Sequence, residues 1–186
     1  MNTLPQLQRP FPRSYWVVPH LFLAGFFPGS HNPAETESHG RALLGCGIRQ
    51  IINLMEANER DHTGNPFPHY QPTFHQLAAE ANSELHCQRM PIPDFSTPSP
   101  EGMRAILDQI DATIAAGHPL YLHCLGGKGR TGTVVGCWLA RHGKATGPEA
   151  IAMLNQLRLG QDSQAHIPAP ETEVQRQMIR TWRPGQ

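Results

Sequence analysis

A segment between residues 122 and 132, with the sequence LHCLGGKGRTG, combines a nucleophile with an anion-binding loop. Three glycines within residues 126–129 let the backbone curl so that N–H groups point inward, and such a nest binds phosphate without a charged side chain. Arg130 adds a planar guanidinium that can hold two phosphate oxygens at once. Cys124 lies at the floor of the loop, where the N–H groups and Arg130 stabilise a thiolate. These residue types at this spacing predict covalent phosphoryl transfer.

The run His-Cys-x5-Arg-Thr, from His123 to Thr131, is the signature of the cysteine-based protein-tyrosine phosphatase superfamily. The chain resembles the dual-specificity branch of that superfamily, and in particular its small bacterial members. The resemblance implies that Cys124 is the nucleophile that forms a phosphocysteine, and that Arg130 clamps the phosphate and the transition state. It also implies that His123 orients the loop and that the Thr131 hydroxyl helps the thiolate leave in the second step. The residues expected to bind phosphate are Leu125, Gly126, Gly127, Lys128, Gly129 and Arg130.

The reaction also needs a general acid for the leaving oxygen. Asp94 stands in the run Met-Pro-Ile-Pro-Asp-Phe-Ser-Thr-Pro, 30 residues before Cys124, after an expected strand and before an expected helix. The family places its acid at this point, so the resemblance assigns the role to Asp94. The run carries Ile-Pro-Asp in place of the Trp-Pro-Asp of the tyrosine-specific enzymes. Glu56 follows another expected strand and is a candidate partner for Arg130 or Lys128.

The elements that must position these residues follow from hydrophobic spacing and turn residues. We expect short strands at 15–18, 21–24, 48–54, 85–90 and 120–123, with a long loop at 56–72. We expect helices at 35–45, at 73–83, from Ser99-Pro100 to Gly117, through Val134–Leu139 to Gly143, at 148–159 and at 172–182. This alternation indicates an α/β fold with a central, mostly parallel sheet flanked by helices. The resemblance implies the protein-tyrosine-phosphatase version of that fold.

Composition and length narrow the possible functions. The 186 residues hold 15 Lys and Arg against 15 Asp and Glu, and a neutral chain argues against nucleic acid as the main partner. No run approaches the ~18 apolar residues of a transmembrane helix, so we expect no membrane insertion. We expect residues 1–13, which are polar and rich in proline, to form a flexible arm rather than a secretory signal, and residues 14–186 to form a single catalytic domain.

The cysteines and histidines predict neither a disulfide framework nor a metal site. The four cysteines have no tight ligand spacing and are interpreted as reduced thiols, which is typical of a cytoplasmic protein. Cys46, Cys87 and Cys137 are interpreted as packing residues, although one of them near Cys124 could form a protective disulfide with it. The eleven histidines include no HExxH or H-x3-H pair, so we expect no metal and no cofactor.

Details of the loop bear on the substrate. The run Gly-Lys-Gly-Arg-Thr-Gly also occurs in the superfamily's phosphoinositide phosphatases, but those carry a Lys directly after the Cys, where this chain has Leu125. No polybasic patch or basic amphipathic helix accompanies the loop. We therefore predict a phosphatase for a small phosphate monoester or for phosphotyrosine or phosphoserine/threonine in proteins. The alternatives are a phosphoinositide or inositol phosphate phosphatase, sulfur or arsenate chemistry on a similar loop, and a pseudophosphatase that only binds phosphate. The joint presence of Cys124, Arg130 and Asp94 favours an active enzyme.

Overall fold

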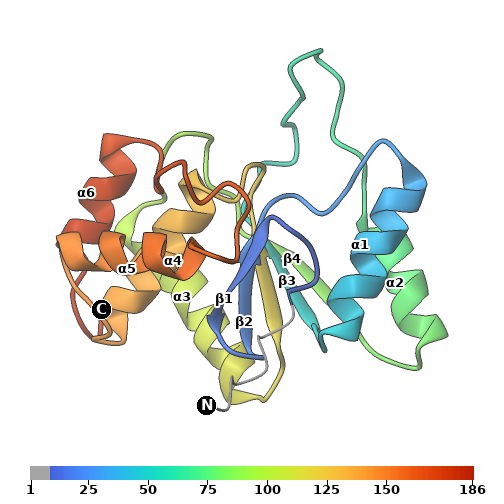
Figure 1. Ribbon diagram of the computed structural model, residues 1–186, viewed down its shortest axis with the longest axis horizontal. Helices are drawn as coiled ribbons and strands as arrows, with labels where there is room; N and C mark the ends of the chain where they lie inside the picture. The colour runs from blue at the N-terminus through green and yellow to red at the C-terminus, as the bar shows by residue number, and fades with distance from the viewer. Residues whose placement is uncertain (1–8) are drawn as a thin grey trace.

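The structure, a computed structural model, describes residues 9–186 and is built around a five-stranded sheet (Figure 1). Its strands are β1 (Ser14–Val18), β2 (Phe22–Gly25), β3 (Gln50–Asn53), β4 (His86–Arg89) and β5 (Leu120–His123), in the order β1-β2-β5-β3-β4. The hairpin strands β1 and β2 pair antiparallel, and every other neighbouring pair is parallel. The expected α/β fold with a mostly parallel central sheet is confirmed.

Parallel pairing brings the carboxyl ends of three strands to one edge of the sheet. Gly25 of β2 lies opposite His123 of β5, and His123 lies opposite Asn53 of β3. Open α/β sheets bind ligands in the crevice outside the carboxyl ends of their strands. Cys124 directly follows β5 and therefore starts the loop at the middle of this edge.

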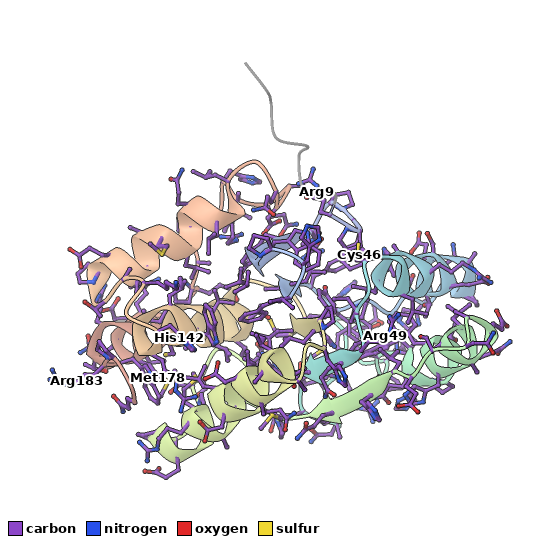
Figure 2. All side chains as sticks on the ribbon, turned by 90° about the horizontal axis from the view of Figure 1, so that it is seen from below. Arg9, Cys46, Arg49, His142, Met178 and Arg183 are labelled. Atoms are coloured by element: carbon purple, nitrogen blue, oxygen red, sulfur yellow. The ribbon has the colours of Figure 1, made fainter. Side chains whose placement is uncertain are left out.

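Helices cover both faces of the sheet. Within residues 9–186 they are α1 (Pro33–Gly45), α2 (Gln71–Glu80), α3 (Pro100–Ala115), α4 (Gly129–Arg141), α5 (Pro148–Arg158) and α6 (Glu173–Thr181). Figure 1 shows α1 and α2 on one side of the sheet and α3 to α6 on the other. Each side has its own apolar core, and Figure 2 shows side chains filling the space on both sides. Strands β3 and β5, which pair only with parallel neighbours, are buried throughout, as parallel strands covered on both faces must be.

Local signals set where most helices begin. Asn32 accepts the N–H of Ala34 at 3.1 Å, and Ser99 accepts the N–H of Gly102 at 3.1 Å, so both act as N-caps. Thr172 and Gln175 form a capping box at the start of α6. Helices α2, α4 and α5 begin without a side-chain cap, and the N-cap residue of α4 is Lys128. The first N–H groups of α4 are therefore left for another acceptor.

Several element ends differ from the sequence-based expectation. The strand expected at 48–54 is confined to Gln50–Asn53, because the N–H of Ile48 bonds to Leu43 O at the end of α1. The helix expected at 73–83 begins at Gln71 and ends at Glu80. Helix α4 begins at Gly129, five residues before the apolar positions that indicated it. Glycines at a helix start carry no hydrophobic periodicity, which explains this last difference.

The end of the expected N-terminal arm is docked on the sheet. Residues 1–8 lie outside the described residues, but Phe11 is only 6% exposed and packs edge-on against Phe26 and Tyr121. Arg13 stacks over the Phe26 ring at 4.4 Å. Among the helices of residues 9–186, none combines the length and the apolar character needed to cross a bilayer.

Candidate active site

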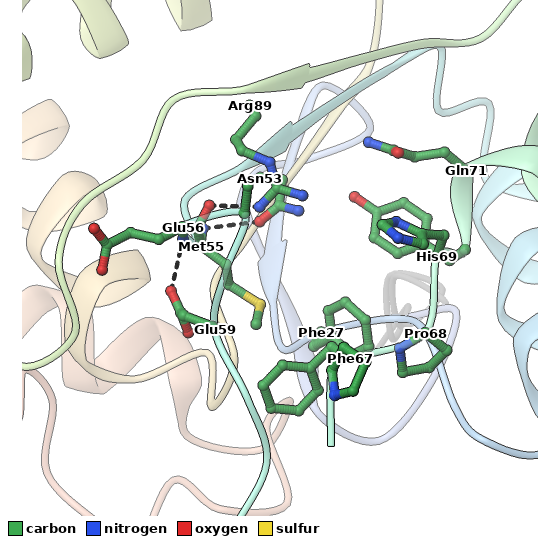
Figure 3. Close-up of a pocket in the computed structure, with 13 residues that line it drawn as sticks. Phe27, Asn53, Met55, Glu56, Glu59, Phe67, Pro68, His69, Gln71 and Arg89 are labelled. Atoms are coloured by element: carbon green, nitrogen blue, oxygen red, sulfur yellow. Dashed lines mark hydrogen bonds between the residues drawn. The ribbon is translucent and has the colours of Figure 1, made fainter. Parts of the chain in front are cut away.

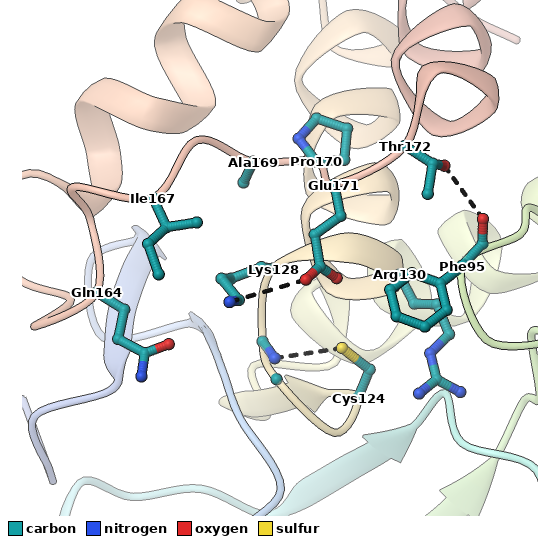
Figure 4. Close-up of polar contacts among 12 residues, drawn as sticks. Phe95, Cys124, Lys128, Arg130, Gln164, Ile167, Ala169, Pro170, Glu171 and Thr172 are labelled. Carbon is teal, nitrogen blue, oxygen red and sulfur yellow. Dashed lines mark hydrogen bonds and ion pairs between the residues drawn. The ribbon is translucent and has the colours of Figure 1, made fainter.

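The loop between β5 and α4 surrounds the sulfur of Cys124. Cys124 is 2% exposed, and the N–H of Gly127 donates to its Sγ at 3.3 Å (Figure 4). Gly127 has φ +73°, and a Cβ placed on it would lie 2.7 Å from the carbonyl carbon of Gly25. Only glycine combines that backbone angle with so close an approach to β2. The expected curl of the loop is therefore a feature of the structure, with one of its N–H groups aimed at the sulfur.

Neighbouring segments fix the loop from outside. The N–H of Phe27 donates to Leu125 O at 3.0 Å, and Arg13 donates from Nη2 to Gly126 O at 3.1 Å. With these carbonyls bonded away from the centre, the loop can present N–H groups to a bound anion. The uncapped start of α4 adds its own N–H groups and the positive end of its dipole.

Arg130, in the first turn of α4, projects into the site and is 2% exposed. Its guanidinium forms a two-point ion pair with Glu59, with the second contact at 3.1 Å, and donates to Ile92 O at 3.2 Å. Its Nη2 also lies 3.1 Å from Oδ1 of Asp94. Burial lowers the pKa of Arg130, but the hydrogen bond with Glu59 and the nearby negative groups outweigh burial and raise it overall. Arg130 is thus a fixed cation at the rim of the loop.

Asp94 lies beside this guanidinium on an exposed loop. Its side chain is 45% exposed, and its Oδ1 accepts the N–H of Phe95 at 3.0 Å. The structure therefore brings together Cys124, Arg130 and Asp94, which the sequence predicts as nucleophile, phosphate clamp and general acid. A phosphate held by Arg130 would lie within reach of the Asp94 carboxyl group.

His123 is completely buried beneath the loop. Its Nδ1 lies 3.2 Å from Cys124 O, and its Nε2 lies 2.7 Å from the hydroxyl of Tyr70. A carbonyl can only accept, so Nδ1 donates the proton, and Nε2 of the neutral ring accepts from Tyr70. Burial lowers the pKa of His123 to about 3. The ring is therefore neutral near pH 7 and fixes the backbone of Cys124 by a hydrogen bond rather than by charge.

Two ion pairs of the site differ from the sequence-based expectation. Glu56 pairs with neither Arg130 nor Lys128; its N–H donates to the carboxylate of Glu59 at 2.7 Å. Glu59 takes the position at Arg130, and Glu171 pairs with Lys128 at 3.7 Å (Figure 4). Glu59 lies in the long loop at 56–72, where no periodic pattern in the sequence marks it as a partner of Arg130.

Thr131 and the other three cysteines are the remaining residues for which the sequence predicts a role. The Thr131 hydroxyl donates to Gly25 O at 3.5 Å, and no hydrogen bond joins it to the Cys124 sulfur in the described part of the chain. Burial raises the pKa of Cys87 to about 12 and raises those of Cys46 and Cys137. All four cysteines are free thiols, and these three are neutral groups that suit packing.

A pocket adjoins the site on the side of Glu59 (Figure 3). The rings of Phe27 and Phe67 form one part of it, and Asn53 and Arg89 line another. Arg89 donates from Nη1 to Met55 O at 2.6 Å, which anchors the start of the loop that carries Glu59. Across residues 9–186, no group of three or more His, Cys, Asp and Glu side chains is arranged to hold a metal ion.

The comparisons with known proteins agree with this geometry. A family model described as "Polymorphic toxin system, DSP-PTPase phosphatase" matches residues 28–144. Dual specificity protein phosphatase CDC14AB of Danio rerio is 42% identical over 156 residues, which cover 78% of this chain and 22% of the relative. Dual specificity protein phosphatase CDC14B of Mus musculus is 28% identical over 149 residues, which cover 78% of this chain and 27% of the relative. The chain therefore spans about a quarter of the length of these curated relatives.

A solved structure shares the fold. The crystal structure of Tk-PTP in the active form superposes with a TM-score of 0.66 at 23% identity, covering 91% of this chain and 95% of that one. The family match covers the region that contains Cys124, Arg130 and Asp94. The chain belongs to the DSP-PTPase family, the dual-specificity group of the cysteine-based protein-tyrosine phosphatase superfamily.

Proposed function

We propose that the chain hydrolyses phosphate monoesters through a phosphocysteine intermediate. The observation that carries this proposal is the geometry around one anion loop. The Cys124 sulfur accepts the Gly127 N–H at 3.3 Å, and Arg130 of the same loop lies 3.1 Å from the carboxylate of Asp94. A nucleophile, an anion clamp and a proton donor thus converge on the carboxyl edge of the sheet.

In the first step, the Cys124 thiolate attacks phosphorus, an S–P bond forms and the P–O bond to the leaving group breaks. Asp94, in its protonated form, gives its proton to the leaving oxygen. The phosphoryl oxygens are held by the N–H groups of the loop and by Arg130. Arg130 already holds Glu59 and Asp94 without substrate, so an incoming phosphate dianion competes with Asp94 for the guanidinium. The negative charge of the bound phosphate also favours the protonated form of Asp94, and the first step requires that form.

In the second step, water attacks the phosphocysteine and the S–P bond breaks. The Asp94 carboxylate takes the proton from this water, so inorganic phosphate leaves and both the thiolate and the protonated acid are restored. The role of Thr131 in helping the thiolate leave stays a prediction from the family resemblance.

Phosphorylated proteins are the substrate class that we propose. Both cations of the loop are already paired, Lys128 with Glu171 and Arg130 with Glu59 and Asp94. The loop therefore has no unpaired side-chain cation for a second phosphate, as an inositol phosphate head group would need. The names of the two CDC14 relatives, which are dual specificity protein phosphatases, support the same choice.

A substrate panel tests this proposal. The purified chain is assayed against peptides with phosphotyrosine, phosphoserine or phosphothreonine, an aryl phosphate and short-chain phosphoinositides. We expect kcat/KM for at least one phosphopeptide to exceed that for every phosphoinositide by about tenfold or more, which is ~1.4 kcal/mol of transition-state stabilisation. The opposite order would show that the substrate class is wrong. Binding of vanadate without turnover of any substrate would show that the chain is a pseudophosphatase.

A further inference from the structure

The start of helix α6 is bonded to the loop that carries Asp94. The hydroxyl of Thr172 donates to Phe95 O at 3.1 Å (Figure 4), and Nε2 of Gln175 donates to Ser96 O at 3.2 Å. Phe95 and Ser96 are the two residues that follow Asp94 in the chain. Two side chains of α6 thus hold the backbone next to the acid from positions 77 and 79 residues away.

The capping box fixes both donor side chains. The Thr172 oxygen accepts the N–H of Gln175 at 3.4 Å, and Oε1 of Gln175 accepts the N–H groups of Glu171 and Thr172 at 3.1 Å each. Gln175 is fully buried. Each side chain therefore accepts hydrogen bonds at the start of α6 with its oxygen atom. With its O–H or N–H it donates to the acid loop, the segment 94–96 that carries Asp94. The two side chains have little rotational freedom, because reciprocal hydrogen bonds hold each of them in one rotamer.

The acid loop has little support of its own. Asp94 is 45% exposed, and Phe95 is 61% exposed with φ +56°, an angle that a bulky side chain rarely adopts. A backbone in such a conformation persists only where its surroundings hold it. Besides the ion pair of Asp94 with Arg130 and the turn formed by the N–H of Ser96 and Pro93 O, the bonds from Thr172 and Gln175 provide that hold.

Helix α6 is fixed in turn to the helix that begins the phosphate loop. Ile179 of α6 packs into the space left by Gly136 of α4, where a Cβ would lie 2.4 Å from its Cδ1. Gln175 itself lies beside Gly129, the first residue of α4, where a Cβ would be 3.1 Å from Nε2. The acid loop and the phosphate loop are therefore held at a set separation by one rigid helix pair.

We propose that Thr172 and Gln175 are positioning residues that hold Asp94 where it can protonate the leaving group. The inference rests on the proposed function, because it assigns the acid step to Asp94. Neither side chain forms a hydrogen bond with Cys124 or Arg130, so their effect passes through the loop at Phe95 and Ser96.

The test uses two substrates that differ in their need for an acid. The leaving group of 4-nitrophenyl phosphate departs without a proton, whereas that of phenyl phosphate needs one. In Thr172→Val we expect kcat/KM for phenyl phosphate to fall about 10- to 100-fold, because a misplaced acid loses much of its effect. The kcat/KM for 4-nitrophenyl phosphate should change less than about twofold, because kcat/KM covers the steps up to phosphocysteine formation and excludes the later water attack that Asp94 also assists. Thr172→Ser, which keeps the hydroxyl, should behave like the wild type.

A second variant separates positioning from helix stability. Thr172→Asp keeps an N-cap acceptor for α6, but an ionised carboxylate cannot donate to Phe95 O. It should show the same selective loss for phenyl phosphate with an unchanged melting temperature. Thr181→Val removes a hydroxyl at the other end of α6, where it bonds only to Gln177 O and Met178 O, and should leave both substrates unaffected.

A double variant distinguishes a positioning role that acts through Asp94 from an effect that is independent of Asp94. In an Asp94→Ala background, Thr172→Val should reduce kcat/KM for phenyl phosphate no further, because both changes remove the same proton donor. Additive losses in the double variant, or equal losses for both substrates in the single variant, would overturn the inference. Undiminished turnover of 4-nitrophenyl phosphate by Cys124→Ser would instead refute the proposed function, so the two failures are distinguishable.

Discussion

Arg130 is the residue on which the site depends, because it is a buried cation that meets two carboxylates. Glu59 holds one side of its guanidinium through two contacts, and Asp94 lies 3.1 Å from Nη2. These carboxylates have different exposure, since the Glu59 side chain is 12% exposed and that of Asp94 is 45% exposed. The more buried carboxylate is suited to orient Arg130, whereas the more exposed one can exchange protons with a substrate and with water.

Asp94→Ala tests the acid at this scale. For phenyl phosphate we expect kcat/KM to fall by about 10²–10⁴, the usual contribution of a general acid. For 4-nitrophenyl phosphate the loss in kcat/KM should be far smaller, because its leaving group departs without a proton and kcat/KM excludes the later water attack. Steady-state kinetics with both substrates measures the difference. An equal loss for both would mean that Asp94 is not the acid.

Cys124→Ser tests the nucleophile in the same way. A hydroxyl is a much weaker nucleophile than a thiolate, so turnover should be abolished. The Gly127 N–H and Arg130 remain in place, so vanadate or phosphate should still bind, as isothermal titration would show. Failure to bind the oxyanion would mean that the loop is not the phosphate site.

At the scale of elements, the loop between β5 and α4 that surrounds Cys124 depends on close contact with the end of β2. Gly127 lies against the backbone of Gly25, and Thr131 bonds to the Gly25 carbonyl. The sequence predicted the loop because its glycines, cysteine and arginine are adjacent in the chain. It could not predict Glu59 or Glu171, since those contacts join Arg130 and Lys128 to distant loops without periodic patterns. Asp94 was found only because the family resemblance placed an acid before the helix at 100–115.

Gly127→Ala tests this contact. A Cβ at φ +73° would be strained and would lie 2.7 Å from the Gly25 carbonyl carbon, so we expect a loss of ~2–4 kcal/mol in the free energy of unfolding. Activity should fall as well, because the Gly127 N–H would move away from the sulfur. At Gly126 an added Cβ would meet only the Lys128 side chain at 3.6 Å, so Gly126→Ala should unfold at nearly the wild-type denaturant midpoint. Similar midpoints for both variants would contradict the described contact.

At the scale of the whole molecule, two apolar cores enclose the sheet, and the catalytic edge lies above both. His123 of β5 faces the core on the side of α1 and α2, where it bonds to Tyr70 at the start of α2 and its ring lies against that of Phe27. The layers, strand types and most helices could be predicted, since hydrophobic spacing repeats within each element. The docking of Phe11 and Arg13 could not, because it depends on surfaces that form only after the sheet has assembled.

Burial of His123 predicts how stability depends on pH. Its pKa falls from 6.5 to about 3 on folding, so below pH 6.5 the unfolded chain binds a proton that the folded chain does not. The free energy of unfolding should therefore decrease as pH falls from 6.5 towards 3, by ~1.4 kcal/mol per unit, or ~2 kcal/mol between pH 7 and pH 5. Denaturant unfolding of the wild type and of His123→Gln measures this slope.

His123→Gln is the control for the wild type, because glutamine does not titrate and can still accept a hydrogen bond from the Tyr70 hydroxyl. The part of the pH dependence that is due to His123 should be absent from this variant, whatever the variant's absolute free energy of unfolding. Parallel slopes in the two proteins would show that His123 is not a buried neutral group.

In the proposed mechanism the phosphoryl group passes through the Cys124 sulfur. The most direct measurement is mass spectrometry of the protein quenched during turnover of 4-nitrophenyl phosphate. We expect one phosphoryl group on the peptide that contains Cys124, and none on that peptide in Cys124→Ser. A phosphoryl group on a different residue, or turnover by Cys124→Ser above a few per cent of the wild type, would contradict the covalent mechanism.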